Sequence, residues 1–395
     1  MQKPSQLGDV SGELDAWHMA RALELAALGR GAVEPNPLVG CVIAHGAEVV
    51  GEGYHRRFGG PHAEVEALRV AGERARGATA YVTLEPCCHF GKTPPCSQSL
   101  LAAGITRVVA AMRDPFPKVD GGGIDELRKA GVEVVVGLRE NESRKLNAPY
   151  LKLLSTGRPW VIAKWAMTLD GKIATHTGDS QWISGEASRA IVHELRGRVD
   201  AIVVGAGTAK ADDPQLTARP PGQAAAARVA TRIVVDDRAS LDLESKLATT
   251  AREIPVIVAA ATNASPIYVA QLRGLGCEVL LLEGASRRER VVELLDELGR
   301  RRMTNILVEG GSSLLGELFD SGEIDEAAVF IAPKLIGGRG APSPIARTGK
   351  QRMAEALELD EPTRSFVGED VFITGHVRRK TLLPRGEGGD VLIDG

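Results

Sequence analysis

The chain has 395 residues, which is enough for two or three domains. Its net charge of -3 provides no broad basic surface, which argues against a nucleic-acid partner because phosphate backbones are usually met by clustered Lys and Arg. The five cysteines are an odd number in a large chain, so a reducing, cytoplasmic setting is favoured over a disulfide framework.

The first domain is predicted over residues 13–150, after a polar N-terminal tail at residues 1–12. The tail lacks the apolar stretch of a signal peptide. No apolar run in the sequence is long enough to span a bilayer, so no membrane partner is expected. The domain begins with a predicted helix between Leu14 and Leu28, where small and apolar residues recur three and four apart.

A sheet is predicted to follow this helix. The β-rich runs VGCVIA and EVVGEGYH predict a hairpin, and ATAYVTL, RVVAAM and VEVVVG predict further strands. Helices are predicted at HAEVEALRVAGERA, which follows Pro61, at SQSLLAAG and at GIDELRKAG. This order indicates one α/β sheet of about five strands with helices between them.

The second domain is predicted over residues 158–380, after a charged stretch at 139–159 where we place the boundary. Its strands are predicted at WVIAKWAM, AIVVGAG, RIVVDD, PVIVAAA, EVLLL, NILVEGG and AAVFIAPKLIG, and helices at EASRAIVHELRGR and RERVVELLDELGRR. Alternating strands and helices favour a mostly parallel sheet covered on both faces. PPGQAAAARVA is expected to be a surface loop, and residues 381–395 a flexible tail.

The first domain contains a pattern that is typical of zinc deaminases. His62 falls in the first turn of its predicted helix, and Cys96 falls at or near the start of the next one. With Cys87, they offer Zn²⁺ one imidazole and two thiolates and leave the fourth position for a water, whose pKa the ion lowers to near neutrality. Glu64 is placed to shuttle protons to the substrate without ligating the metal. Cys88 adjoins Cys87; we favour Cys87 because it follows Glu-Pro.

Each of these residues has an ordinary structural interpretation when taken alone. A His at the start of a helix is usually a cap or a surface residue, and adjacent cysteines more often belong to a core. The ordered set, with a His-x-Glu helix followed by Glu-Pro-Cys, a loop and Cys, favours the metal site. The loop CHFGKTPP is longer than the two residues of the usual Pro-Cys-x-x-Cys signature, and it is expected to select something other than a plain nucleoside.

The motifs PNPLVGCVI, GEGYH, PHAEVEAL and LEPCCHFGKTPPC resemble the deaminase half of the bifunctional riboflavin-biosynthesis deaminase–reductase family. That family commonly has Ser at the position of Cys88. The resemblance implies a cytidine-deaminase-like α/β/α domain. It also implies that Asn36 lies in the pyrimidine-binding site and that His89 and Lys92 help to bind the ribose phosphate.

In the second domain, the residues alone indicate only a phosphate-binding turn. No G-x-G-x-x-G motif is present, and GAGTAKAD lacks the third glycine. In NILVEGGSSLLGELF a buried strand leads through two glycines into a helix start, where backbone N–H groups attract phosphate. A glycine-rich turn that binds no ligand explains this sequence about equally well.

The second domain resembles the reductase half of the same family, through KWAMTLDGKIA, GDSQWIS, ELRGRVDAIVVGAGTAKADDPQLTAR, VEGG and IAPKLIGG. The resemblance implies a dihydrofolate-reductase-like α/β fold that uses NADPH. The implied NADPH-binding residues are Ala166, Trp182, Thr208, Asp212, Gly311, Ser312, Ser313 and Leu314. The implied substrate-binding residues are Ser180, Arg196, Leu216, Arg219 and Glu309. Lys164 and Asp170 are candidates for proton transfer.

The resemblance implies a two-step reaction on a small phosphorylated pyrimidine. Deamination of 2,5-diamino-6-ribosylamino-4(3H)-pyrimidinone 5′-phosphate, with one Zn²⁺ per chain, precedes NADPH-dependent reduction of the ribosyl side chain, which gives 5-amino-6-ribitylamino-uracil 5′-phosphate. A homo-oligomer, either a dimer or a tetramer, is expected. Sequence motifs do not distinguish NADPH from NADH here.

Three other functions remain open at this point. The chain could be a nucleoside or tRNA deaminase, although its charge balance and long cysteine loop argue against that. It could join a deaminase to an inactive or regulatory NADPH-binding domain. It could also be a non-enzymatic zinc-stabilised module, although such structural sites usually have four protein ligands.

Overall fold

The computed structural model describes residues 11–89, 94–219 and 228–378. It divides into two compact units, Met1–Pro159 with Asp296–Thr304, and Trp160–Leu295 with Asn305–Gly395. Lys92, the first ten residues, residues 220–227 of the predicted surface loop and the 381–395 tail lie outside the described residues. Among the described residues, no helix combines the length and the hydropathy needed to cross a membrane.

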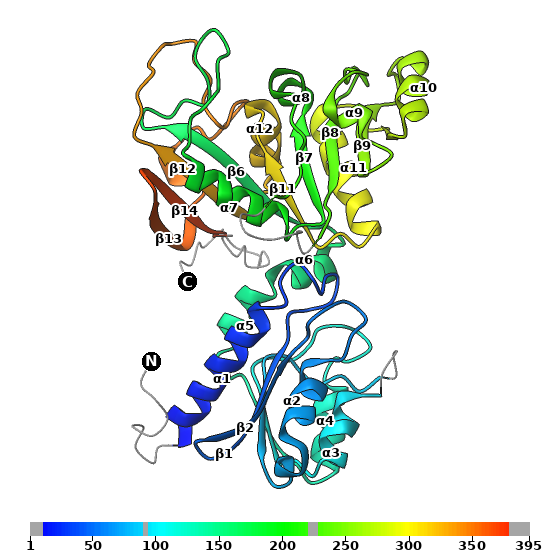
Figure 1. The fold of residues 1–395 in the computed structure, drawn as a ribbon, viewed down its shortest axis with the longest axis vertical. Helices are drawn as coiled ribbons and strands as arrows, with labels where there is room; N and C mark the ends of the chain where they lie inside the picture. The colour runs from blue at the N-terminus through cyan, green and yellow to red at the C-terminus, as the bar shows by residue number, and fades with distance from the viewer. Residues whose placement is uncertain (1–10, 90–93, 220–227, 379–395) are drawn as a thin grey trace, which may run out of the picture. The chain divides into compact units, whose positions relative to one another are not determined.

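The first unit is built on a five-stranded sheet with the strand order β2-β1-β3-β4-β5 (Figure 1). Strand β1 pairs antiparallel with β2 and β3, whereas β3, β4 and β5 run parallel. The strands are β1 (Gly40–His45), β2 (Glu48–Tyr54), β3 (Thr79–Val82), β4 (Arg107–Ala110) and β5 (Glu133–Val136). This confirms the predicted hairpin and the predicted strand number.

Helices lie on both faces of this sheet because its strands are apolar on both sides. In β1, Cys41 and Ile43 pack with residues of α2, α3 and α4, while Val42 and Ala44, which point the other way, pack with α1. The helices are α1 (Ser11–Ala27), α2 (Ala63–Ala71), α3 (Cys96–Ala102), α4 (Gly122–Lys129), α5 (Glu140–Leu146) and α6 (Ala148–Thr156), with a 3-10 turn at Gly72–Ala75. The 139–159 stretch, where we expected the domain boundary, is therefore mostly helical.

Small residues let helix α2 lie directly on the β1–β2 hairpin. A β-carbon at Gly53 would lie 2.4 Å from the backbone N of Ala67 and 2.5 Å from the carbonyl O of Ala63. Such distances are too short for any side chain, so glycine is required at this position. The close contact fixes the start of α2, which carries two of the predicted site residues.

The second unit is built on a nine-stranded sheet with the order β10-β9-β8-β7-β11-β6-β12-β14-β13. All neighbours from β10 to β12 are parallel, and β14 and β13 add an antiparallel hairpin at the β12 side. The strands are β6 (Trp160–Thr168), β7 (Ala201–Gly205), β8 (Thr231–Val235), β9 (Val256–Ala261), β10 (Glu278–Leu282), β11 (Asn305–Glu309), β12 (Glu326–Ala332), β13 (Leu359–Val367) and β14 (Asp370–Val377). The prediction of a mostly parallel sheet is confirmed.

The helices of the second unit connect these parallel strands (Figure 1). They are α7 (Glu186–Arg196), α8 (Ala206–Asp212), α9 (Lys246–Thr249), α10 (Pro266–Leu275), α11 (Arg287–Arg300) and α12 (Ser312–Ser321), with a 3-10 turn at Met353–Glu355. The central strands β7, β9 and β11 are buried along their whole length, which explains their continuous apolar sequences. Helices α8, α9 and α10 and the β13–β14 hairpin were not predicted.

Candidate functional sites

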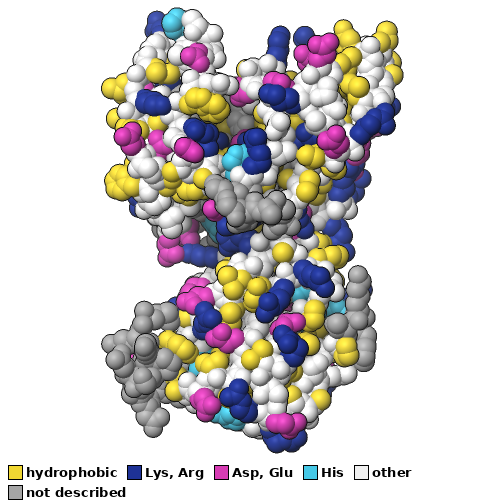
Figure 2. Space-filling model, in the orientation of Figure 1, with side chains coloured by type: hydrophobic (Ala, Val, Ile, Leu, Met, Phe, Trp, Pro, Cys, Tyr) yellow, Lys and Arg dark blue, Asp and Glu magenta, His cyan; other side chains and the backbone are white. Residues whose placement is uncertain are grey.

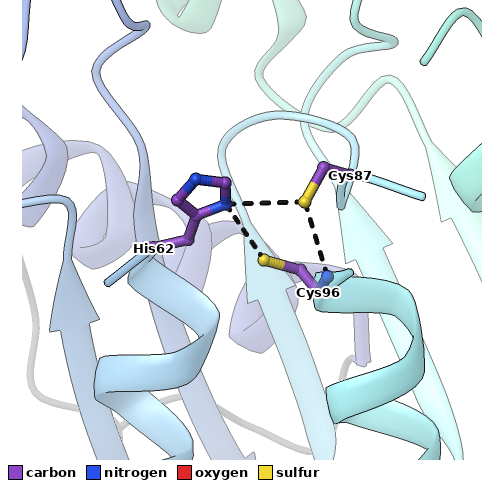
Figure 3. Close-up of side chains that lie close together, drawn as sticks. All are labelled: His62, Cys87 and Cys96. Atoms are coloured by element: carbon purple, nitrogen blue, oxygen red, sulfur yellow. Dashed lines mark hydrogen bonds between the residues drawn. The ribbon is translucent and has the colours of Figure 1, made fainter. Parts of the chain in front are cut away.

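Three predicted zinc ligands come together in the first unit. His62 caps the start of α2, Cys96 is the first residue of α3, and Cys87 lies in the loop after β3. The His62 Nδ1 atom lies 3.2 Å from Sγ of Cys96 and 3.5 Å from Sγ of Cys87, and the backbone N–H of Cys96 donates to Sγ of Cys87 over 3.4 Å (Figure 3). All three ligand atoms lie within 4.8 Å of one another.

The chemistry of these donors fits a zinc ion. One imidazole and two thiols are the ligand types of a catalytic zinc site that keeps a position open. The hydrogen bond from the Cys96 thiol, together with His62, lowers the pKa of Cys87 to about 4, while Cys87 and burial raise the pKa of Cys96. The thiolate form of Cys87, which is the form that binds a metal, is therefore favoured near neutral pH.

Glu64 lies beside this cluster as a buried carboxyl. It is 3% exposed, and its Oε2 atom is buried without a hydrogen-bond partner among the described residues. Burial, reinforced by the negative charge of Cys87, raises the pKa of Glu64 to about 7. A buried oxygen without a partner is costly unless something else binds it, so the site fits a metal ion with an additional polar reactant.

The structure places Cys87, rather than Cys88, beside the other two ligands. The Cys88 Sγ atom donates to the carbonyl of Lys118 at 3.7 Å. A β-carbon at Gly122, at the start of α4, would lie only 2.8 Å from that sulfur. Cys88 therefore faces the loop before α4 and not His62.

Asn36 is linked to this cluster through a histidine that the sequence analysis did not single out. His55 Nδ1 contacts the carbonyl of Pro61 at 2.9 Å, and because a carbonyl only accepts, this nitrogen carries the proton. His55 Nε2 must then accept from Nδ2 of Asn36, at 3.2 Å. The rings of His55 and His62 pack edge to face with their centroids 5.4 Å apart. The position of His55 at the end of GEGYH, just ahead of PHAE, was the available signal.

Glu85, in the Glu-Pro-Cys motif, holds the segment that carries Cys87. It is buried, and its carboxylate accepts four backbone N–H groups from the 114–124 segment. The bonds run from Gly123 (3.0 Å), Gly121 (3.1 Å), Ile124 (3.2 Å) and Asp114 (3.3 Å). His89, further along the loop, stacks at a tilt on Phe116, with ring centroids 6.1 Å apart. The sequence marked Glu85 only as part of a motif.

In the second unit, Glu309 is the centre of a buried charge cluster. It ends β11 and accepts from Arg196 at 2.5 Å and 2.9 Å, and Lys164 Nζ lies 3.6 Å away. Burial alone would raise the pKa of Glu309, but the charges of Arg196 and Lys164 outweigh burial and lower that pKa to about 2. Burial lowers the pKa of Lys164. Three predicted residues are therefore brought together here.

The loop after α8 continues this cluster. Arg196 also donates to the carbonyl of Thr217 at 3.3 Å, and the backbone N–H of Arg219 donates to Nδ1 of His193 at 3.3 Å. Leu216 is buried in the same loop at a φ of 51°. Ser180 donates to Asp212 at 3.3 Å. Asp170 was the other candidate for proton transfer. Its carboxylate accepts hydrogen bonds from Thr168 and from the backbone N–H groups of residues 336 and 337.

The predicted cofactor residues of α12 form a glycine-lined turn against α8. Gly310 and Gly311 have φ values of 81° and 80°, and Gly311 caps the helix that begins with Ser312 and Ser313. A β-carbon at Gly311 would lie 3.2 Å from Oγ1 of Thr208. A glycine turn that ends at free helix N–H groups fits a cofactor phosphate.

The remaining two predicted cofactor residues, Trp182 and Ala166, lie on the β6 side of the sheet. The Trp182 ring is 65% exposed, lies under Cζ of Arg189 at 4.7 Å, and its carbonyl accepts from Lys334 at 2.6 Å. Ala166 lies in β6, in register with Phe330 of β12.

Two family models match the chain, and they follow the two units. The cytidine and deoxycytidylate deaminase zinc-binding region matches residues 13–112, and the RibD C-terminal domain matches residues 159–371. The riboflavin biosynthesis protein RibD of Actinobacillus pleuropneumoniae is 43% identical over 370 residues, which cover 94% of this chain and 96% of that protein. The chain belongs to the RibD family.

Solved structures agree with this assignment over both units. RibD of Acinetobacter baumannii, form 1, superposes with a TM-score of 0.81 at 35% identity, covering 93% of this chain and 100% of that one. A Thermotoga maritima protein, described as a diaminohydroxyphosphoribosylaminopyrimidine deaminase/5-amino-6-(5-phosphoribosylamino)uracil reductase, superposes with a TM-score of 0.80 at 34% identity, covering 93% and 99%.

As a RibD protein, the chain is a bifunctional enzyme of riboflavin biosynthesis, with deaminase and reductase activities. Its fold is the expected one, a cytidine-deaminase-like domain with a zinc-binding region followed by a dihydrofolate-reductase-like domain. Family membership favours this enzyme over a nucleoside deaminase, over an inactive second domain and over a non-enzymatic zinc module.

Proposed function

We propose that this RibD protein carries out the two reactions named for its Thermotoga maritima relative. The first unit deaminates 2,5-diamino-6-ribosylamino-4(3H)-pyrimidinone 5′-phosphate. The second unit then reduces the ribosyl side chain to ribityl. The observation that carries the proposal is the His62–Cys87–Cys96 cluster, with the buried Glu64 beside it, whose Oε2 atom has no partner among the described residues.

In the deaminase unit, we assign His62, Cys87 and Cys96 as the ligands of one zinc ion per chain. When bound, zinc acts as a Lewis acid that makes a water molecule nucleophilic at neutral pH. Glu64 takes one proton from the attacking water on its Oε2 atom and passes it to the ring nitrogen. It then carries a second proton, from the hydroxyl group formed on the ring carbon, to the amino group that leaves as ammonia. Its pKa of about 7 suits an exchange in both directions near neutral pH.

The same unit supplies groups that orient the substrate. Asn36, held through its amide nitrogen by His55, keeps its amide oxygen available to the amino groups of a pyrimidine. His89 and Lys92 belong to the long loop between the two cysteines, which we assign to the ribose phosphate. This loop distinguishes the substrate from a plain nucleoside.

In the reductase unit, bound NADPH would supply the hydride for reduction of C1′ of the ribosylamino group, which would react in its open-chain imine form. The glycine turn and the first residues of α12, from Gly311 to Leu314, hold the cofactor phosphates. Ala166, Trp182, Thr208 and Asp212 line the rest of the cofactor site.

The charge cluster of this unit orients the substrate. Arg196 and Glu309 fix each other by two hydrogen bonds, which holds the carboxylate rigid beside Lys164, a group able to hold a proton. Arg219 is exposed, and the fork of its guanidinium suits the 5′-phosphate, which it binds through two oxygens. Ser180 and Leu216 complete the proposed substrate site.

The proposal includes a cytoplasmic, homo-oligomeric enzyme, either a dimer or a tetramer, that acts on small phosphorylated pyrimidines. The exposed edge strand β13, where Phe366 is 86% exposed, supports self-association. On the face drawn in Figure 2, Lys and Arg side chains alternate with Asp and Glu, which suits a small substrate better than a nucleic-acid backbone.

The test is a two-part assay on the zinc-loaded protein. With the diaminopyrimidinone phosphate, we expect ammonia release, and with the deaminated product we expect oxidation of NADPH, followed by nicotinamide absorbance. Cytidine serves as the control and should release no ammonia. Ammonia release from cytidine but not from the phosphorylated pyrimidinone would contradict the proposed substrate and favour a nucleoside deaminase.

A further inference from the structure

Arg287 is the first residue of α11, and part of its guanidinium group is buried. Its Nε atom is buried and has no hydrogen-bond partner among the residues that the structure describes. A buried donor without a partner is costly, and this one also carries charge. The two proposed reactions do not use this residue, so its ligand must be sought in what lies around it.

The guanidinium lies where β7, α8 and α12 meet. A β-carbon at Gly205, the last residue of β7, would lie 4.0 Å from Nη2 of Arg287 and 3.8 Å from Cβ of Leu314 in the first turn of α12. Gly205 also caps α8, which carries Thr208. Arg287 therefore borders the elements that we assign to the cofactor, at the carboxyl end of a central parallel strand, where nucleotides bind in such sheets.

A neighbouring ion pair removes the acidic group that would oppose an anion here. Arg290, one helical turn after Arg287, donates to Oδ1 of Asp237 at 3.0 Å and to the carbonyl of Gly284 at 2.7 Å. Asp237 lies just beyond β8, the strand next to β7. In dinucleotide sites an acidic side chain accepts from a free ribose 2′-hydroxyl, whereas an Arg accommodates a 2′-phosphate. Here the acid is already paired with Arg290, whereas Nε of Arg287 has no partner among the described residues.

We propose that Arg287 binds the 2′-phosphate of NADPH and that it, together with the Arg290–Asp237 pair, makes the reductase select NADPH over NADH. The inference rests on the proposed use of a nicotinamide cofactor. A phosphomonoester carries nearly two negative charges and matches the guanidinium fork. The cofactor diphosphate is served separately by the N–H groups at the start of α12.

The test measures binding of adenosine 2′,5′-bisphosphate and of 5′-AMP by calorimetry, with the full zinc-loaded chain. Arg287→Gln should weaken bisphosphate binding by about tenfold to a hundredfold and leave 5′-AMP binding within about twofold, because one charge-assisted contact to the 2′-phosphate is lost. Arg288→Gln, on the neighbouring exposed position, removes the same charge and should change neither affinity. Urea unfolding curves of the second unit that match wild type show that each variant is folded.

A second pair of variants tests whether Arg290 neutralises the charge of Asp237 at the proposed phosphate site. Arg290→Gln should also weaken bisphosphate binding, because it frees the charge of Asp237, and adding Asp237→Asn should restore much of the loss. Equal losses for both ligands in Arg287→Gln would show that Arg287 serves the 5′-phosphate, and no loss would show that it binds no phosphate; either result overturns the inference. A wild-type protein that binds NADPH and NADH equally would also overturn the inference, whereas one that binds neither nucleotide would contradict the proposed nicotinamide cofactor.

Discussion

Glu85 shows how one buried carboxylate can hold the segment of a proposed metal ligand that it does not touch. Its two oxygens accept four backbone N–H groups of the 114–124 segment, and Cys87 follows two residues later. Glu85→Gln replaces one accepting oxygen with an NH₂ group that faces two donors. We expect zinc affinity to fall by about tenfold to a hundredfold, the range seen for residues that orient metal ligands.

The measurement is competition for zinc with a coloured chelator at fixed pH. Glu142→Gln, at an exposed carboxylate paired with Arg139, is the matched control and should leave the affinity unchanged. A Glu85→Gln protein that is less stable but keeps wild-type zinc affinity would show that Glu85 supports only the fold.

Glu309 makes the stability of the second unit depend on pH. Arg196 and Lys164 hold its pKa at about 2 against the opposing effect of burial, while an unfolded Glu titrates near ~4.3. A lowered folded pKa adds stability above the unfolded value, and this stability is lost as the pH falls toward the folded value. The difference in unfolding free energy between wild type and Glu309→Gln should therefore shrink by ~1–2 kcal/mol between about pH 5 and pH 3.

Urea unfolding at a series of pH values measures this difference. Its shrinkage would show that the Glu309 carboxylate is ionised in the folded protein and neutralised in the unfolded one as the pH falls. A difference that stays constant over the whole range would mean that the Arg196 and Lys164 contacts contribute nothing through charge.

At the scale of elements, the β11–α12 turn combines a backbone requirement with the cofactor-binding role that we propose for it. Gly311 and Gly322, at the two ends of α12, have φ values of 80° and 71°. A β-carbon at Gly311 would lie 3.2 Å from Oγ1 of Thr208, whereas nothing lies within 4 Å at Gly322. Alanine at either position should cost about 1–2 kcal/mol through backbone strain.

Only Gly311→Ala should also weaken NADPH binding, by roughly tenfold, because the turn then shifts the N–H groups that face the phosphates. Calorimetric titration with NADPH, next to urea unfolding of both variants, separates the two effects. Equal affinities in the two variants would place the cofactor away from this turn.

The elements that the sequence predicted are those with a strong local pattern. The β1–β2 hairpin and the buried strand β11 leading to the α12 glycines followed from β-rich, apolar runs and from turn residues. The β13–β14 hairpin was missed because β13 is largely exposed and contains Pro362 and charged residues, which hide any alternation. Helix α8 was missed because its seven residues AGTAKAD give too short a pattern.

The residues of the candidate sites likewise include some that the sequence could predict and some that it could not. His62, Glu64 and the cysteines could be predicted because metal chemistry restricts both residue type and spacing. His55 and Glu85 could not, because their roles depend on hydrogen bonds with backbone groups that only the folded chain brings near. The family resemblance implied that Arg196 and Glu309 both bind the substrate, but their hydrogen bonds to each other, far apart in sequence, were not predicted.

At the scale of the whole molecule, each compact unit contains its own set of reacting groups. The cluster around Glu64 lies within the first unit, and the Glu309 cluster and the α12 turn lie within the second. Neither set borrows a residue from the other unit among the contacts described above. The two activities should therefore be separable by single substitutions.

The most direct measurement compares wild type with Glu64→Gln, both with zinc content verified. We expect the variant to release ammonia from the diaminopyrimidinone phosphate at least about a hundredfold more slowly, because it has lost its proton carrier, and to oxidise NADPH at the wild-type rate when given the deaminated product. Glu309→Gln should show the reverse pattern. Ammonia release at the wild-type rate from Glu64→Gln, or a parallel loss of both activities at unchanged zinc content, would contradict the account of two independent sites.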